Sequence, residues 1–204
     1  AADGLPDPGP IVGWGTPILR TLTDIAAVVT IGWLLAAAFL DPSSRDGVVS
    51  RTGRFDLRLA TASALAWAVL ALLQMFFELA NVLGLPLSKA ASPDIVSTYA
   101  NEIPTTRALL FMAILAFVVA VGSLITATTG AGAAWLLVAV AGASLPAIAG
   151  HAAGLGDHAL ATTAGVTHVV AAVLWIGGEA GSGKTTLADT AASRLRSAGW
   201  RTVH

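Results

Sequence analysis

Three of the four histidines lie in one stretch of the chain, and the long apolar region before them has none. His151 and His158 flank the hexapeptide AAGLGD, and His168 follows within an apolar run, about 12 Å below the start of that run if it is helical. Imidazole is a good ligand for copper and other borderline metals, and the chain has no cysteine to replace it. The three histidines therefore predict a metal site. The alternative is two solvated loop histidines and a His168 that packs between helices.

Other donors and another cofactor are compatible with the same stretch. Met75 and Met112 are either thioether ligands for Cu(I) or core residues, and we expect core packing. Two opposed histidines on facing helices could instead hold a b-type haem in an electron-transfer bundle. Only His168 lies well inside an apolar run, which favours a metal ion over a haem with two histidine ligands.

A second chemical motif follows directly on the apolar run. Residues 178–185 read GEAGSGKT and satisfy G-x-x-x-x-G-K-[ST], with Gly178, Gly183, Lys184 and Thr185 at the fixed positions. In this pattern backbone N–H groups cradle phosphates, the lysine reaches the β- and γ-phosphates of ATP, and the threonine binds Mg²⁺. A working domain also needs a further carboxylate, a sheet and a substrate pocket, which the 27 residues from 178 to 204 cannot supply. We expect no enzyme activity, although a truncated P-loop kinase or NTPase is an alternative.

Two carboxylates within apolar stretches are candidates for a charged pathway. Asp24 and Glu78 would each cost roughly 2.5–3.5 kcal/mol at mid-membrane, so such residues usually have a partner or line a route. Their sequence positions predict that both lie toward the outer side and could face one cavity. Alternatively, both are hydrated at the interface, with Asp24 paired to Arg20 one helical turn away. Gln74 lies one turn before Glu78 and should share its face.

The elements that position these residues are predicted to be transmembrane helices. Hydrophobic residues make up 55% of the chain and charged residues 11%, far from the roughly 25% charge of soluble proteins. A hydrocarbon core of about 30 Å needs roughly 20 apolar residues in a helix. Five runs meet or approach that length: 18–40, 59–83, 108–127, 133–148 and 160–177. The fold class is therefore all-α, a polytopic transmembrane bundle. The Gly and Ala content of the fourth span and its Pro146 predict a kinked or closely packed helix.

The loop charges predict the orientation. Lys and Arg in short loops are retained on the cytoplasmic side, and the loop after the first run carries four arginines. Alternation then places the N-terminus and the His151–His158 loop outside and the basic tail inside. The net charge of −1 gives no case for nucleic-acid binding.

Three strings resemble a known family. They are TDIAAVVTIGWLLAAAFL, IPTTRALLF and GHAAGLGDHALATTAGVTHVVAAVLWIGG, and they are similar to the membrane domain of copper resistance protein D (CopD). The resemblance covers about residues 10–178 and implies copper uptake or tolerance at a bacterial plasma membrane. It carries over His151 and His168, with His158, as copper ligands. Family members usually continue with further helices, so we expect a homo-oligomer or missing helices to complete the bundle.

The sequence thus predicts three segments. Residues 1–17 form an extracytoplasmic lead-in, 18–178 a partial copper-resistance domain in the lipid bilayer, and 179–204 a truncated βα fragment in the cytoplasm. The last segment resembles the P-loop start of a uridine-kinase-like protein. We interpret the boundary as a junction at which a membrane protein runs into the first unit of a kinase.

Overall fold

The computed structural model describes residues 7–40 and 47–150. Within these ranges every regular element is a helix, and the only strand-like pairing is an isolated antiparallel bridge between Val48 and Thr128. The elements are α1 (Pro10–Leu35), a π-helical continuation η1 (Ala36–Leu40), α2 (Arg51–Leu83), α3 (Leu87–Ala90), α4 (Pro93–Tyr99), α5 (Pro104–Ile125) and α6 (Thr129–Gly150).

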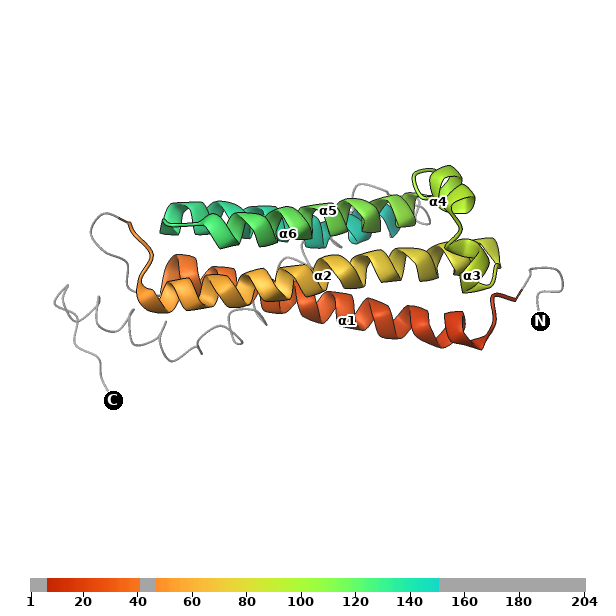
Figure 1. Cartoon of the computed structure of the whole chain (residues 1–204), viewed down its shortest axis with the longest axis horizontal. Coiled ribbons are helices and arrows are strands. Elements are labelled where there is room, and N and C mark those ends of the chain that lie inside the picture. Colours follow the sequence, from red (N-terminus) through yellow and green to blue (C-terminus); the bar gives the residue numbers. More distant parts are fainter. Residues whose placement is uncertain (1–6, 41–46, 151–204) are drawn as a thin grey trace, which may run out of the picture.

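Four long helices lie side by side and form a bundle (Figure 1). Helix α1 packs on α2, α2 on α5, α5 on α6, and α6 returns to α1 and η1. The short helices α3 and α4 connect α2 to α5 at one end of the bundle, which we call the α3–α4 end. The opposite end carries Arg51, Arg54 and Arg58 at the start of α2, and we call it the arginine end.

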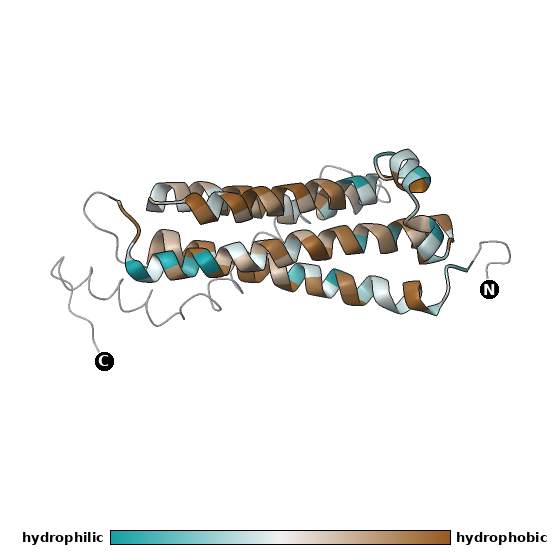
Figure 2. Ribbon diagram, viewed as in Figure 1, coloured by the Kyte–Doolittle hydropathy of each residue, from teal (hydrophilic) through white to brown (hydrophobic). Residues whose placement is uncertain are grey.

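The four long helices are each long and apolar enough to cross a membrane. This confirms the predicted all-α class and four of its five spans, while the expected fifth span, 160–177, lies outside the described residues. Hydrophobic side chains cover the outside of the long helices as well as the inside (Figure 2), including the exposed residues Phe111, Phe117, Leu124 and Leu137. An outer surface of this kind suits contact with lipid. The chain is therefore a multi-pass membrane protein.

The helices begin earlier than the apolar runs that predicted them. Helix α1 starts at Pro10, eight residues before the expected span, and therefore includes the second half of the expected lead-in. Proline is well suited to a first helical turn because its fixed φ matches the helix and its missing N–H would have no partner there. Helix α2 starts at Arg51, again eight residues early, after Ser50, whose Oγ accepts a hydrogen bond from the Gly53 N–H at 3.0 Å. Apolar length marks the part of a helix that lies in lipid, whereas caps mark where the helix begins.

Close packing of small residues holds the bundle together. Alanines occupy the buried faces of α2 and α5, where small side chains let helices in membranes approach closely. The fourth span follows the same principle, as expected: α6 runs without interruption through Pro146, and a Cβ on Gly142 would lie 3.3 Å from the Trp67 ring. A Cβ on Gly122 of α5 would overlap the Trp135 ring of α6. A side chain at position 122 would force the Trp135 ring to move, whereas one at position 142 would need only a small shift of the Trp67 ring.

Backbone hydrogen bonds fix the connections at the arginine end. The Val49 N–H donates to the Ala127 carbonyl and the Thr129 N–H to the Gly47 carbonyl, both at 3.0 Å. The segment that leads into α2 is therefore attached to the turn between α5 and α6. This attachment places the start of α6 at the arginine end and, about 32 Å further along the helix, its last residue, Gly150, at the α3–α4 end.

Candidate functional site: a charged column on α1 and α2

The predicted site residues divide into those that the structure describes and those that it does not. Asp24 lies on α1 and Glu78 on α2. The histidines and the Walker A positions lie outside the described residues: His151, His158, His168, Gly178, Gly183, Lys184 and Thr185. The last described residue, Gly150, lies at the α3–α4 end and directly precedes His151 in the sequence.

Two contacts fix how α1 and α2 lie against each other. The Thr30 hydroxyl donates a hydrogen bond to the Ser63 Oγ at 3.0 Å, and a Cβ on Gly15 would overlap the Phe77 ring. The helices run in opposite directions, so Asp24, six residues before Thr30, is level with residue 69 of α2. The Gly15–Phe77 contact, counted in the same way, places Asp24 level with residue 68 of α2. The two contacts agree on the level of Asp24 to within one residue.

This register places Asp24 deeper in the bundle than its sequence position suggests. Residues 59–77 of α2 contain no charged side chain and span about 28 Å, close to the hydrocarbon thickness of about 30 Å. Arg58 and Glu78 bound this stretch, so Glu78 is at one border of the apolar layer. Residues 68 and 69 lie at its middle, and Asp24 is level with them. By this register the two carboxylates lie at different depths, with Asp24 further from the α3–α4 end than Glu78.

Arg20 connects the two carboxylates electrostatically. It lies one helical turn from Asp24, as the sequence predicted, and its positive charge acts on both Asp24 and Glu78. By the same register Arg20 is level with residues 72 and 73 of α2, between the other two charges in depth. We call Asp24, Arg20 and Glu78 the charged column. It runs from the border of the apolar layer to its middle.

The side chains of the charged column lie on the outside of the four-helix bundle. Asp24 and Arg20 are exposed and Glu78 is half-buried. A charge on a lipid-facing surface near mid-membrane costs roughly 2.5–3.5 kcal/mol, and such residues almost always face protein or a water-filled path. The column therefore marks the face of α1 and α2 that should be covered by protein or water rather than lipid.

The interior of the bundle holds the residues that were expected to pack. Met75 and Met112 are both buried in the hydrophobic core, which supports their interpretation as packing residues. Gln74 is buried too, so it faces the core more than the half-buried Glu78 does. Within the described ranges, no three His, Cys, Asp or Glu side chains come together in a group that could hold a metal ion.

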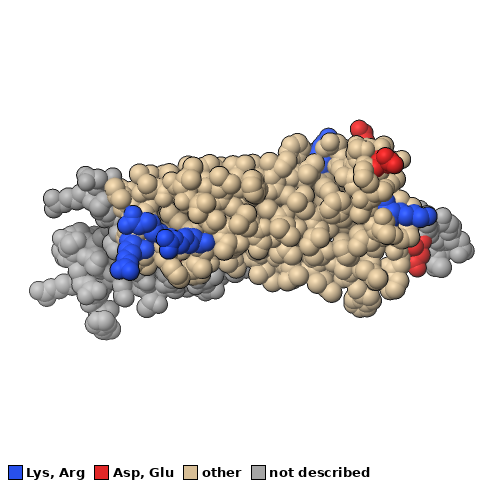
Figure 3. All heavy atoms as spheres, in the orientation of Figure 1, with Lys and Arg blue, Asp and Glu red and all other residues tan. Residues whose placement is uncertain are grey.

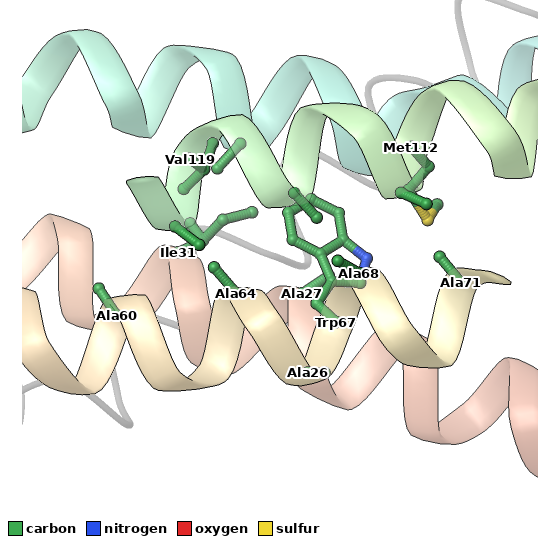
Figure 4. Close-up of a cluster of buried hydrophobic side chains, with 14 of the residues drawn as sticks. Ala26, Ala27, Ile31, Ala60, Ala64, Trp67, Ala68, Ala71, Met112 and Val119 are labelled. Atoms are coloured by element: carbon green, nitrogen blue, oxygen red, sulfur yellow. The ribbon is translucent and has the colours of Figure 1, made fainter. Parts of the chain in front are cut away.

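Sequence reasoning missed Trp67, the largest fully buried side chain among the described residues. It lies between α2 and α5, with Ala64 and Ala68 on its own helix, and its ring nitrogen faces the side on which Met112 lies (Figure 4). Among the residues that the structure describes, no hydrogen-bond partner reaches the Trp67 Nε1. The available signal was the position of Trp67 within an alanine-rich face, at the spacing of four residues from Ala71.

Comparison with protein families shows where this arrangement belongs. Residues 10–159 match the family model of the copper resistance protein D-like N-terminal domain. The chain belongs to the copper resistance protein D-like family. Comparisons with curated proteins and with solved structures find no significant match.

The extent of the match defines what the family accounts for. This copper resistance protein D-like domain includes all four long helices, the charged column, His151 and His158. The match confirms the expected family over most of its expected range, but it ends at residue 159, before His168 and the Walker A segment. The family and the apolar helices together fit a membrane protein in copper resistance.

Proposed function

We propose that this protein handles copper ions at the plasma membrane of a bacterium, in uptake or tolerance, through histidines near the α3–α4 end. The observation that carries the proposal is the family match over residues 10–159. In the proposed mechanism His151 and His158 collect copper ions at this end and His168 accepts them within the membrane region. Histidine suits each of these steps because its imidazole side chain binds copper without help from cysteine.

The charged column gives this route a negative charge. With all three groups ionised, Asp24, Glu78 and Arg20 carry a net charge of −1, which favours a cation beside them. Glu78 at the border of the apolar layer and Asp24 at its middle would lower the electrostatic cost for a copper ion that moves inward. In this proposal the two carboxylates supply charge along the route, while the histidines supply the ligands.

The arrangement of basic residues supports an orientation with the arginine end in the cytoplasm. Arg51, Arg54 and Arg58 all lie at that end and satisfy the preference for Lys and Arg on the inner side. We propose that the N-terminus and the histidines accordingly face the outside. The charged column requires a cover in this membrane, and we propose that a second copy or further helices of a longer protein provide it.

Copper binding by detergent-purified protein tests the function. A competition titration with a Cu(I) chelator should show stoichiometric binding by the parent and its loss in a His151→Ala/His168→Ala double variant. His204→Ala is the matched control, because His204 lies in the tail and has no place in the proposed route. Equal binding by parent and double variant would refute the ligand assignment.

We propose no catalytic role for the Walker A segment. The family match that carries the proposed function ends at residue 159 and lends no support to nucleotide chemistry at residues 178–185. ATP binding that is lost in Lys184→Ala would contradict this part of the proposal. A Soret absorption band in the purified protein would favour a haem-binding electron-transfer bundle instead.

A further inference from the structure

The three arginines at the start of α2 share one region of the surface. Arg51, Arg54 and Arg58 follow the spacing of three and four residues that brings side chains to one side of a helix. All three are exposed. They form the basic patch at the left end of the space-filling view (Figure 3), on the face where α2 lies in Figure 1.

The first turn of α2 contains no acidic residue. A helix N-terminus carries a partial positive charge and favours acidic side chains, so two arginines in its first four residues are electrostatically unfavourable there. An external anion beside the arginines would remove this conflict.

The depth of the patch matches the lipid headgroups. Arg58 directly precedes the uncharged residues 59–77, whose length of about 28 Å corresponds to the hydrocarbon layer. Residues 51–58 then extend about 10 Å beyond that layer, into the zone that holds the phosphates of the lipids. The arginines are thus at the level of the phosphates, and their side chains are directed outward from the bundle.

An apolar side chain accompanies the arginines. Phe55, between Arg54 and Arg58 in sequence, is 58% exposed, and Val48 just before the helix is 43% exposed. Exposed apolar groups beside basic ones are typical of surfaces that sit in a membrane interface, with the apolar groups toward the acyl chains. Water-soluble anions offer no contact for an exposed phenylalanine, whereas a phospholipid offers both a phosphate and an acyl chain.

We propose that Arg51, Arg54 and Arg58, together with Phe55, form a binding site for the headgroup of an anionic phospholipid. The guanidinium groups hold the phosphate in paired hydrogen bonds, for which arginine is better suited than lysine. Phe55 contacts the upper part of an acyl chain. The bound lipid compensates the positive end of α2 and fixes the depth of the arginine end in the membrane.

Lipid binding by the whole purified chain tests this site. Native mass spectrometry would count phosphatidylglycerol and phosphatidylcholine molecules bound in separate titrations. We expect a clear preference for phosphatidylglycerol in the parent. Each arginine-to-glutamine change should reduce this preference roughly fivefold. The variant Arg51→Gln/Arg54→Gln/Arg58→Gln should therefore show a preference lower by a factor on the order of 100. A double variant at the α3–α4 end, Lys89→Gln/Arg107→Gln, is the matched control and should change it by less than about threefold.

A competition with inorganic phosphate and a salt titration complete the test. Inorganic phosphate should not displace the lipid, and displacement at similar concentrations would show a site for free anions and overturn the proposal. An equal loss in the control variant, or none in the triple variant, would also overturn it. If the glutamine variant does not fold, the salt dependence of the parent protein tests the site instead. Its preference for phosphatidylglycerol over phosphatidylcholine must fall as the salt concentration is raised. A preference unaffected by salt would contradict an arginine–phosphate site.

Discussion

Trp67→Ala should clearly destabilise the four-helix bundle. The Trp67 side chain is completely buried between α2 and α5, and its ring also meets the backbone of α6 at Gly142, where an added Cβ would be 3.3 Å away. Truncation of a buried tryptophan to alanine typically costs 3–5 kcal/mol, because contacts are lost and a cavity remains. Alanine also removes the buried Nε1 donor, which no described residue satisfies and whose burial costs about 1–3 kcal/mol. The free energy of unfolding should therefore fall by about 2 kcal/mol, the difference between the centres of the two ranges.

The assay is equilibrium unfolding in mixed detergent micelles, followed by helical circular dichroism. Leu65→Ala is the matched control, since Leu65 is on the same helix but is 43% exposed on the lipid-facing side, and its cost should stay below about 1 kcal/mol. Trp67→Phe keeps most of the ring and removes the unpartnered donor, so it should change stability by less than about 1 kcal/mol in either direction. If Trp67→Ala were no more harmful than Leu65→Ala, Trp67 would not be the centre of the α2–α5–α6 packing and the reasoning would fail.

Three further outcomes follow from the described contacts. A double-mutant cycle of Thr30→Ala and Ser63→Ala should give a coupling energy of about 0.5 kcal/mol in micelle unfolding, and additive effects would contradict the hydrogen bond between α1 and α2. Ser50→Ala should lower the free energy of unfolding by about 1 kcal/mol through loss of the cap on α2, with Ser50→Gly costing less. Asp24→Asn should change copper accumulation by cells severalfold, downward for a role in uptake and upward for a role in tolerance, whereas Asp94→Asn, on the surface of α4, should not. Equal accumulation in both variants would remove Asp24 from the route.

The sequence was sufficient for the fold class because lipid imposes a length on each apolar segment. Four of the predicted spans coincide with the observed long helices, although 108–127 runs two residues past the end of α5, and the family resemblance was confirmed over residues 10–159. Helix starts were less predictable. Hydropathy cannot detect the polar first turns of α2, although Ser50 followed by a helix is a recognisable cap.

The position of Asp24 could not be predicted from the sequence, since depth depends on how two helices are set against each other. That register follows from the Thr30–Ser63 hydrogen bond and from the Gly15–Phe77 contact, neither of which has a signature in a single helix. The electrostatic influence of Arg20 on Asp24 was predictable, because it needs only the spacing of one helical turn. The core role of Trp67 also depends on partners from two other helices.

X-ray absorption spectroscopy of the copper-loaded protein identifies the atoms that bind copper. We expect copper surrounded by imidazole nitrogen, with this signature lost in the His151→Ala/His168→Ala variant. Copper bound by sulfur would instead point to Met75 and Met112, and an unchanged nitrogen signature in the variant would show that these histidines are not the ligands. Either result would contradict the proposed site.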